Sequence, residues 1–284
     1  MAFPRVTLGR TGLRVSPIGL SAAYGIGARG VQRAFESGMN YMYWGSVRRP
    51  GFARGVRAIA KTRRDDLVVV VQSYSRSKLA MRPSVESALR ALAIERADVL
   101  LLGWWNQLPP RRILEGALAL REAGKVGHIM ISCHHRPAFR TFIDEPLFDA
   151  IMVRYNAAHR GAETEVFPHL AHRDEPPGVV AYTATRWARL LDPTLTPPGE
   201  RTPTASDCYR FAISHESVDM CLCGPKNDDQ LMGALDALEA GPMDEEELAW
   251  MRRVGDAVHR ATAAETTPVR WWRRLAGRVR AVAR

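Results

Sequence analysis

The stretch Leu67-Val68-Val69-Val70-Val71 decides the fold, because it carries apolar, mostly β-branched residues without polar alternation. Such a run predicts a strand that is buried on both faces, as in a parallel sheet covered by helices. Residues 84–92 follow, with their apolar side chains on one helical face and Ser84 as a candidate N-cap. A second apolar run comes at residues 99–102. This order of strand, helix and strand predicts a βαβ unit.

The same alternation continues along the chain. Further apolar runs of strand length lie at residues 128–131, 151–153 and 179–182, and helix-like segments separate them. Residues 110–123 form one such segment, with Pro110 in the first turn and Gly124 after the last residue. A length of 284 residues with 46% apolar content suits one eight-stranded barrel. We therefore expect an α/β protein of the (β/α)8 TIM barrel class, with residues 1–263 in the barrel.

Composition favours a soluble protein of enzyme size. The first residues, 1–6, lack the apolar core of a signal peptide, and no apolar stretch approaches the roughly 20 residues that span a bilayer. We therefore expect a cytoplasmic protein. The cysteines are too few for a disulfide framework, so we expect reduced thiols, with a metal pair at Cys221 and Cys223 as the alternative.

The formal net charge of +10 invites a nucleic-acid interpretation, but the basic residues are biased towards arginine. Only four of the 40 basic residues are lysine. A bias of this kind can reflect genome composition, and much of the excess lies near the end of the chain. We therefore expect no nucleic-acid partner.

Residues 264–284 form a separate basic tail in our interpretation. The apolar residues Trp272, Leu275, Val279 and Val282 are spaced 3, 4 and 3 apart, which gives one helical stripe, and arginines form another face. A basic amphipathic helix with tryptophan can lie on an anionic membrane surface. The same stripe can instead dock on the chain's own barrel or on a second subunit, which is the interpretation we favour.

Eight segments carry a family resemblance. Residues 7–20 contain Leu8-Gly9-Arg10-Thr11-Gly12-Leu13, and seven further segments follow at residues 38–41, 64–71, 97–102, 124–127, 155–156, 180–182 and 223–226. In this order and at this spacing, they resemble segments of the aldo-keto reductase superfamily. The resemblance implies a TIM barrel with an N-terminal β-hairpin and a C-terminal helical extension.

The same resemblance implies where the catalytic tetrad of these reductases would stand. The aspartate and the general-acid tyrosine align with Tyr43 and Arg48, the lysine that lowers the pKa of that tyrosine aligns with Gln72, and the histidine that orients the carbonyl aligns with Gly103. A positioned acid contributes roughly 10² to 10⁴ in rate. Since Gln72 has no charge with which to lower the pKa of a phenol, we expect conventional aldehyde reduction to be lost.

Residues at the carboxyl ends of the predicted strands are the candidates for a replacement site, because barrel chemistry is located there. The candidate proton donors are Tyr43, Tyr74 and His134. The candidate substrate-binding residues are Trp44, Arg48, Gln72, Trp104 and Arg154. Indole rings stack on planar molecules and arginine binds carboxylates through two hydrogen bonds, so we expect a small substrate that is acidic or aromatic.

These residues also have plainer interpretations. Trp104 and Trp105 can merely fill the volume that polar side chains have left, and His134 and His135 can be ordinary loop histidines. Metal binding by Cys133 and the two histidines would need a distant ligand pair that we do not identify, so we expect no metal.

The resemblance implies a partly retained site for NADP(H). The expected cofactor-binding residues are Ser132, Tyr182, Gly224 and Lys226, of which Tyr182 would stack on nicotinamide and Lys226 would meet a 2′-phosphate near a helix start. Other contacts of the family are replaced, by Cys133, Met152 and residues 233–234. A core tyrosine at a strand end is the alternative for Tyr182.

Three functions remain open at this point. The first is a divergent, oxidoreductase-type enzyme with NADP as cofactor and a substitute proton donor. The second is a catalytically inactive homologue that acts as a binding or regulatory protein. The third is a non-redox barrel enzyme, because the same barrel position binds phosphates in many such enzymes.

Overall fold

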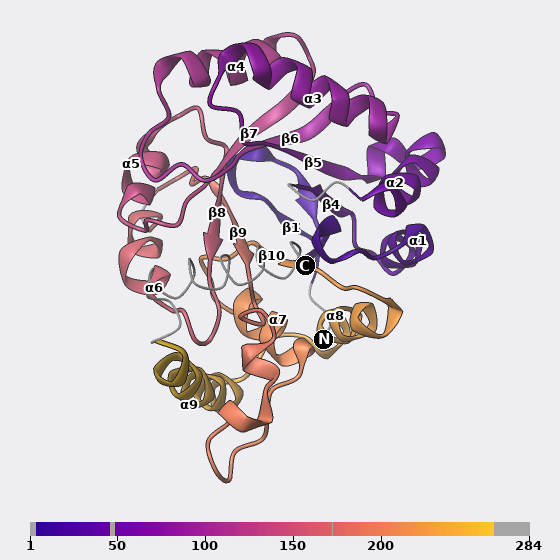
Figure 1. Ribbon diagram of the computed structural model, residues 1–284. Helices are drawn as coiled ribbons and strands as arrows, with labels where there is room; N and C mark the ends of the chain where they lie inside the picture. The colour runs from indigo at the N-terminus through magenta and orange to yellow at the C-terminus, as the bar shows by residue number, and fades with distance from the viewer. Residues whose placement is uncertain (1–3, 46–48, 172, 264–284) are drawn as a thin grey trace, which may run out of the picture.

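The computed structural model describes residues 4–45, 49–171 and 173–263. Eight parallel strands close into a barrel in the order β10-β3-β4-β5-β6-β7-β8-β9 (Figure 1). The strands are β3 Ile18–Ser21, β4 Tyr41–Trp44, β5 Val68–Ser73, β6 Ala97–Leu102, β7 Val126–Ser132, β8 Ala150–Arg154, β9 Gly178–Tyr182 and β10 Met220–Cys223. The predicted (β/α)8 barrel is therefore confirmed.

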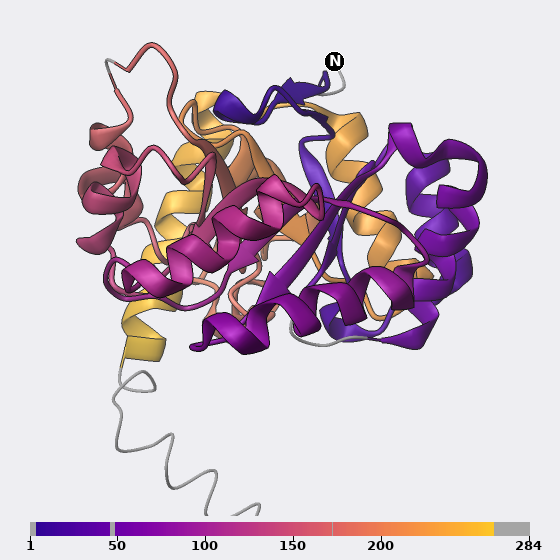
Figure 2. The same ribbon diagram turned by 90° about the horizontal axis from the view of Figure 1, so that it is seen from above.

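Helices surround the barrel on its outside (Figures 1 and 2). They are α1 Ala28–Glu36, α2 Pro50–Arg63, α3 Lys78–Leu92, α4 Arg111–Glu122, α5 Ala138–Asp144, α6 Ala162–Glu165, α7 Ala205–Ile213, α8 Asp228–Ala240 and α9 Glu245–Thr262. The helix α9 follows the last βα unit and is the C-terminal helical extension that the resemblance implies.

A short hairpin closes the amino-terminal end of the barrel (Figure 2). Its strands β1 Val6–Thr7 and β2 Arg14–Val15 pair antiparallel, and Leu8 and Val15 belong to the core inside the barrel. The backbone at Gly9 has a φ of +43°, and a Cβ there would lie 2.1 Å from the backbone nitrogen of Gly178. Only glycine fits this approach without strain, so the hairpin is held against the start of β9.

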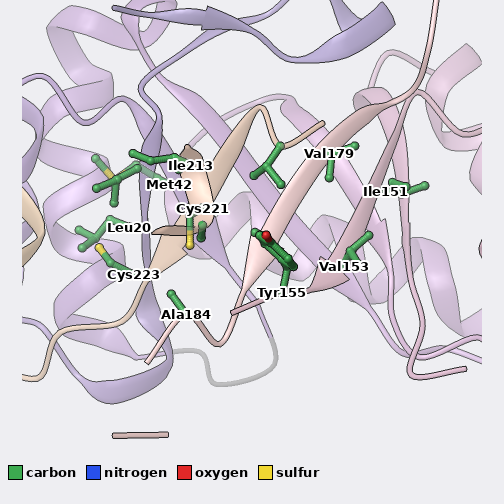
Figure 3. Packing of buried hydrophobic residues seen from close by; sticks show 14 of the residues in the cluster. Leu20, Met42, Ile151, Val153, Tyr155, Val179, Ala184, Ile213, Cys221 and Cys223 are labelled. Carbon is green, nitrogen blue, oxygen red and sulfur yellow. The ribbon is translucent and has the colours of Figure 1, made fainter. Parts of the chain in front are cut away.

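Two layers of apolar packing result from the alternation of side chains along each strand. The inner layer fills the barrel with residues such as Tyr41, Val70 and Leu101. The outer layer packs the barrel wall against the helices, and Figure 3 shows part of it around Met42 and Cys221. All four cysteines are buried free thiols, and burial raises the pKa of Cys133 to about 11.

One predicted boundary was wrong. The helix expected to begin after Ser84 begins at Lys78, so Ser84 lies inside α3 and Ser77 takes the N-cap position. The error arose at Pro83, because proline disfavours helical conformation in the residue before it. Here α3 accommodates Pro83 near its amino-terminal end. The prediction for residues 110–123 is confirmed by α4, which is followed by Gly124 in a left-handed conformation.

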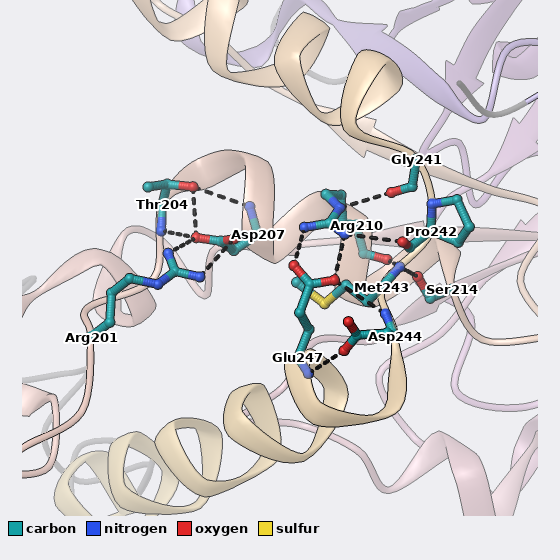
Figure 4. Close-up of polar contacts among 10 residues, drawn as sticks. All are labelled: Arg201, Thr204, Asp207, Arg210, Ser214, Gly241, Pro242, Met243, Asp244 and Glu247. Carbon is teal, nitrogen blue, oxygen red and sulfur yellow. Dashed lines mark hydrogen bonds and ion pairs between the residues drawn. The ribbon is translucent and has the colours of Figure 1, made fainter. Parts of the chain in front are cut away.

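A polar network fixes α7 against α9 (Figure 4). The Arg210 guanidinium donates to both carboxylate oxygens of Glu247, each at 2.6 Å, and to the carbonyls of Gly241 and Pro242. Each of the two helices begins with a capping box, at Thr204 for α7 and at Asp244 for α9. The network matters for function because α7 and α8 both contribute side chains to the cavity described below.

Within the described ranges, no helix is long and apolar enough to cross a membrane. The tail at residues 264–284 lies outside these ranges. Its predicted helical stripe, including Trp272, and its proposed docking on the barrel, a second subunit or a membrane therefore remain predictions.

Candidate functional site

A cavity of about 430 Å³ opens at the carboxyl ends of the barrel strands. It lies between the ends of β4 to β6 and the loops that follow β9 and β10, with side chains from α7 and α8 at its border. The structure brings most of the sequence-predicted site residues into its lining. These are Tyr43, Gln72, Tyr74, Trp104, Ser132, Tyr182, Gly224 and Lys226.

A second hollow, of about 730 Å³, lies near the amino-terminal end of the barrel. Its charged lining is balanced, since four arginines face four acidic residues, and one pair, Arg64 and Asp98, is only 2.9 Å apart. Because catalytic residues of TIM barrels lie at the opposite end, we place the candidate site in the first cavity.

The floor of the cavity is a neutral pair. The Tyr43 hydroxyl donates a hydrogen bond to the side-chain carbonyl of Gln72, which is buried. Burial raises the pKa of Tyr43 well above its usual value, and the neighbouring tyrosines raise it further. The phenol is therefore a weak acid at neutral pH and its proton is directed at an amide.

Gly103 follows β6 beside this pair. A Cβ at Gly103 would lie 2.3 Å from the Gln72 side-chain nitrogen and 2.5 Å from the Tyr74 ring. The space that a larger side chain would need at position 103 is thus filled by Gln72 and Tyr74. The glycine and its two neighbours form one packed unit.

Aromatic side chains form a row at the mouth. The rings of Tyr74 and Trp104 meet edge to face at 5.3 Å, and the indole of Trp104 lies 5.4 Å from the His134 ring. His134 in turn approaches Tyr182, with 3.3 Å between the tyrosine hydroxyl and Nδ1. Burial lowers the pKa of His134, and the charge of Arg154 lowers it further. The imidazole is therefore neutral at pH 7.

Arg154, at the end of β8, lies beside this row. Its Nη2 is 3.0 Å from Nδ1 of His134, and its guanidinium lies 5.4 Å from the Trp187 ring. Trp187, Trp104 and Tyr182 line the cavity, whereas Arg154 and His134 contact these residues and are not themselves part of the lining. The predicted grouping of Trp104, His134 and Arg154 is thus present in space.

Of the candidate cofactor-binding residues, Ser132 and Tyr182 lie beside the aromatic row. Ser132 is buried and its hydroxyl accepts the backbone N–H of Trp104 at 3.2 Å, which leaves the hydroxyl proton free to donate. Met152 also lines the cavity but offers no amide. The Cys133 thiol points elsewhere, towards the carbonyl of His135 and the side chain of Asn106.

Gly224 and Lys226 stand between β10 and α8. A Cβ at Gly224 would lie 2.6 Å from the Tyr24 ring, so glycine allows this ring to cover the backbone. The side chain of Lys226 is exposed, and in the described ranges it faces no carboxylate within ion-pair distance. Two acids, Asp228 and Asp229, occupy the first turn of α8, and Asp228 pairs with Arg33. Lys226 is therefore the positive group of this end of the cavity.

Trp44 and Arg48, two of the predicted substrate-binding residues, are not among the residues that the structure places at the site. Trp44 is 3% exposed and belongs to the packing between barrel and helices, because alternate residues of β4 point outward. Its placement in the cavity wall was therefore wrong. Arg48 lies outside the described residues. Trp105 is buried under the Arg76 guanidinium at 3.8 Å, which matches its volume-filling interpretation.

Several lining residues were missed by the sequence reasoning. Trp187 follows β9 by five residues, so reading the loop further past the apolar run would have found it. Tyr209 comes from the buried face of α7, where no strand-end pattern points to it. Tyr24 ends the short helical turn Ala22–Tyr24 after β3, where no apolar run points to it.

The class that fold and site define is a TIM barrel with a hairpin at its amino-terminal end and a ligand-sized cavity at the other. More particularly, the fold is that of the aldo-keto reductases. An aldo-keto reductase of Bacillus halodurans in its holo form superposes with a TM-score of 0.77 at 20% identity, over 89% of this chain and 97% of that one. A Klebsiella pneumoniae aldo-keto reductase, solved in complex with NADPH, gives 0.71 at 22% identity, over 90% and 96%.

Sequence comparison gives a weaker likeness. The chain is 26% identical over 220 residues to the 2,5-diketo-D-gluconic acid reductase B of a Corynebacterium species, which covers 66% of this chain and 77% of that enzyme. No protein-family model matches the chain.

Proposed function

We propose that the protein is a divergent member of the aldo-keto reductase family that binds NADP(H) and a small organic molecule in the cavity above the Tyr43–Gln72 pair. In this proposal it is an oxidoreductase whose proton transfer does not use the family's tetrad. The observation that carries the proposal is the cavity itself, which runs from Gln72 to Lys226 and includes Tyr182 and Ser132. The relatives named above, one of them solved with NADPH, support it.

The residues present fit such a cofactor. Lys226 provides a positive charge without a carboxylate partner in the described part of the chain, which suits a phosphate. Tyr182 offers a ring face, Ser132 offers a free hydroxyl proton, and Gly224 leaves the backbone open to close approach. When bound, NADPH would supply a hydride.

The chain's own residues then determine how a proton moves. Tyr43 is held on Gln72 and is a weak acid, as its raised pKa indicates. His134 is neutral at pH 7 and its Nδ1 already accepts from Arg154, so it is neither a strong acid nor a free base. Tyr74, exposed at the mouth, is the remaining candidate donor. None of these three side chains is a strong acid, so the site favours a reaction that does not depend on a strong acid to protonate an alkoxide.

The same pair supports a second candidate function. Because the Tyr43–Gln72 hydrogen bond leaves no charged acid or base at the floor of the cavity, the barrel would also suit a protein that binds small ligands without turning them over. The two candidates share the cavity and differ only in whether hydride is transferred.

Titration with NADPH, followed by cofactor fluorescence, tests the proposal. We expect saturable binding in the micromolar range and weaker binding of NADH, which lacks the 2′-phosphate. The Lys226→Met variant should bind NADPH about 10-fold more weakly, since hydrogen bonds to charged groups contribute about 1.5–3 kcal/mol. Lys61→Met, which removes an exposed lysine from α2, is the matched control and should change nothing.

A barrel that binds neither NADPH nor NADH would contradict the proposal and leave the ligand-binding protein or a non-redox enzyme. Equal loss of NADPH binding in Lys226→Met and Lys61→Met would show that Lys226 has no specific part. Single-turnover oxidation of bound NADPH in the presence of substrate would separate the enzyme from the binding protein.

A further inference from the structure

Arg154 differs from other partly buried arginines of this chain in its partners. Arg64 faces Asp98 at 2.9 Å, Arg160 faces Asp256 at 2.8 Å, and Arg210 faces Glu247 at 2.6 Å. Across the described ranges, the guanidinium of Arg154 has no carboxylate within ion-pair distance. Its neighbours are the neutral groups His134, Tyr182 and Trp187.

The hydrogen-bonding capacity of Arg154 is also only partly used. Its Nη2 donates to His134, while its Nε–H is buried and meets no acceptor among the described residues. Buried polar groups in proteins are nearly always hydrogen-bonded, and a planar guanidinium offers donors in a fork that matches a carboxylate. The neighbouring groups supply no countercharge, since an imidazole is neutral or cationic and burial raises the pKa of the Tyr182 phenol.

Two exposed indoles stand on either side of this cation. The side chain of Trp104 lies on the far side of His134 and that of Trp187 lies next to Arg154, and the two residues are 57% and 55% exposed. Both have left-handed backbone conformations, with φ of +56° and +52°. Such conformations cost roughly 1–3 kcal/mol for residues other than glycine and cluster at functional sites.

We propose that the mouth of the cavity binds an aromatic carboxylic acid, with its carboxylate on Arg154 and its ring against Trp104 or Trp187. The proposal rests on the proposed function, because it names the class of substrate that this site would take. Indoles stack on aromatic rings, and a cavity of about 430 Å³ lies within the range of small-molecule sites. A guanidinium whose direct contacts are neutral side chains suits a planar carboxylate with one charge better than a phosphate with two.

Isothermal titration of the full chain with 2-naphthoate, 2-naphthamide and phenyl phosphate tests this assignment at pH 7.5. We expect saturable binding of 2-naphthoate and at least 10-fold weaker binding of the neutral amide and of phenyl phosphate. Arg154→Gln should weaken naphthoate binding at least 10-fold and change amide binding less than twofold. Arg154→Lys, which keeps the charge and loses the fork, should lie between the two.

Two further variants separate charge from stacking. Trp187→Leu should weaken the acid and the amide to the same extent, because it removes a ring face and leaves the cation. Arg140→Gln, which neutralises an exposed arginine on α5, should bind like the wild type. Circular dichroism and thermal melting establish that each variant is folded.

The proposal is overturned if the amide or the phosphate binds as tightly as naphthoate, if none of the three binds, or if Arg154→Gln has no effect on naphthoate. NADPH titration of the same preparations keeps the two proposals apart. Naphthoate binding without NADPH binding would refute the cofactor and leave the acid site standing, while the reverse result would refute the acid site alone.

Discussion

The Tyr43 hydroxyl donates to the side-chain carbonyl of Gln72 and so joins the ends of β4 and β5 at the floor of the cavity. If the resemblance to the aldo-keto reductases holds at these positions, an aspartate and a lysine of that family correspond to Tyr43 and Gln72. Our account is that a neutral, buried hydrogen bond has replaced a charged pair. Such a pair holds the two strands together but cannot lower the pKa of a neighbouring phenol.

A double-mutant cycle tests whether the two side chains depend on each other. Tyr43→Phe alone should destabilise the protein by about 1–3 kcal/mol, because it leaves the buried Gln72 carbonyl without its donor. Gln72→Leu in the same background should recover much of that loss, since both polar partners are then gone. Urea denaturation measures the free energies of unfolding. Additive effects of the two changes would contradict the coupling.

The packed unit around Gly103 predicts that a methyl group is not tolerated there. Gly103→Ala should lose roughly 1–3 kcal/mol, as overpacking does, because Gln72 and Tyr74 would have to move. Gly233→Ala in the middle of α8 is the matched control. A Cβ there meets only Ala205 at 3.5 Å, so the helix should gain up to about 1 kcal/mol. Thermal melting that ranks the two variants in the opposite order would refute this packing.

The Arg210–Glu247 pair should contribute far more to stability than ion pairs on the surface. Arg210→Met leaves two backbone carbonyls without their donor and leaves Glu247 with only the Asp244 backbone N–H, so we expect a loss of roughly 3 kcal/mol. Arg82→Met breaks the exposed pair with Glu86 and should cost no more than about 0.5 kcal/mol. Chemical denaturation of both variants provides the comparison, and similar losses would count against the network in Figure 4.

Asp219 lies between the hairpin and the barrel and makes the stability of the folded protein depend on pH. Burial raises its pKa from 3.8 to about 6, although the backbone N–H groups of Val179 and Gly9 donate to it. The folded protein therefore holds this proton more tightly than the unfolded chain. The resulting stability is fully present below about pH 4 and is lost as the pH rises through about 6. The difference between the unfolded pKa of 3.8 and the folded pKa of about 6 corresponds to roughly 3 kcal/mol of folding stability.

Asp219→Asn should remove this pH dependence, so the variant should gain stability relative to the wild type as the pH rises from 4 to 7. Asp149→Asn is a control of opposite sign. Burial alone would raise the pKa of Asp149, but hydrogen bonds from His128 and from the Ile129 backbone bring it below its usual value. That variant should lose stability relative to the wild type as the pH rises towards about 4, and should change little above about pH 5. Melting temperatures between about pH 2.5 and 7 test both variants, and parallel curves for Asp219→Asn and the wild type would contradict the assignment.

Much of the fold could be predicted from the sequence because five of the eight barrel strands, β5 to β9, correspond to short apolar runs. Residues 67–71 and 99–102 correspond to β5 and β6, and the capped segment at residues 110–123 corresponds to α4. The start of α3 could not be read correctly, because Pro83 usually marks a boundary and here lies inside the helix. Local propensity was overridden by packing of the helix on the barrel.

The site was predictable where a residue lies at the carboxyl end of its strand. Tyr43, Gln72 and Tyr182 occupy one of the last two positions of β4, β5 and β9 and line the cavity. Trp44 shows the limit of this rule, because its neighbour points inward and alternation turns Trp44 outward. Tyr209 could not have been found this way, since it reaches the cavity from a helix.

The central claim is that the barrel retains a cofactor cavity while Tyr43, Gln72 and Gly103 have displaced the proton-delivery residues. Steady-state reduction of 4-nitrobenzaldehyde with saturating NADPH, on protein for which cofactor binding has been measured, tests it most directly. The account predicts saturable NADPH binding and no aldehyde reduction above the buffer rate. Rapid turnover of this simple aldehyde by the purified chain would contradict it.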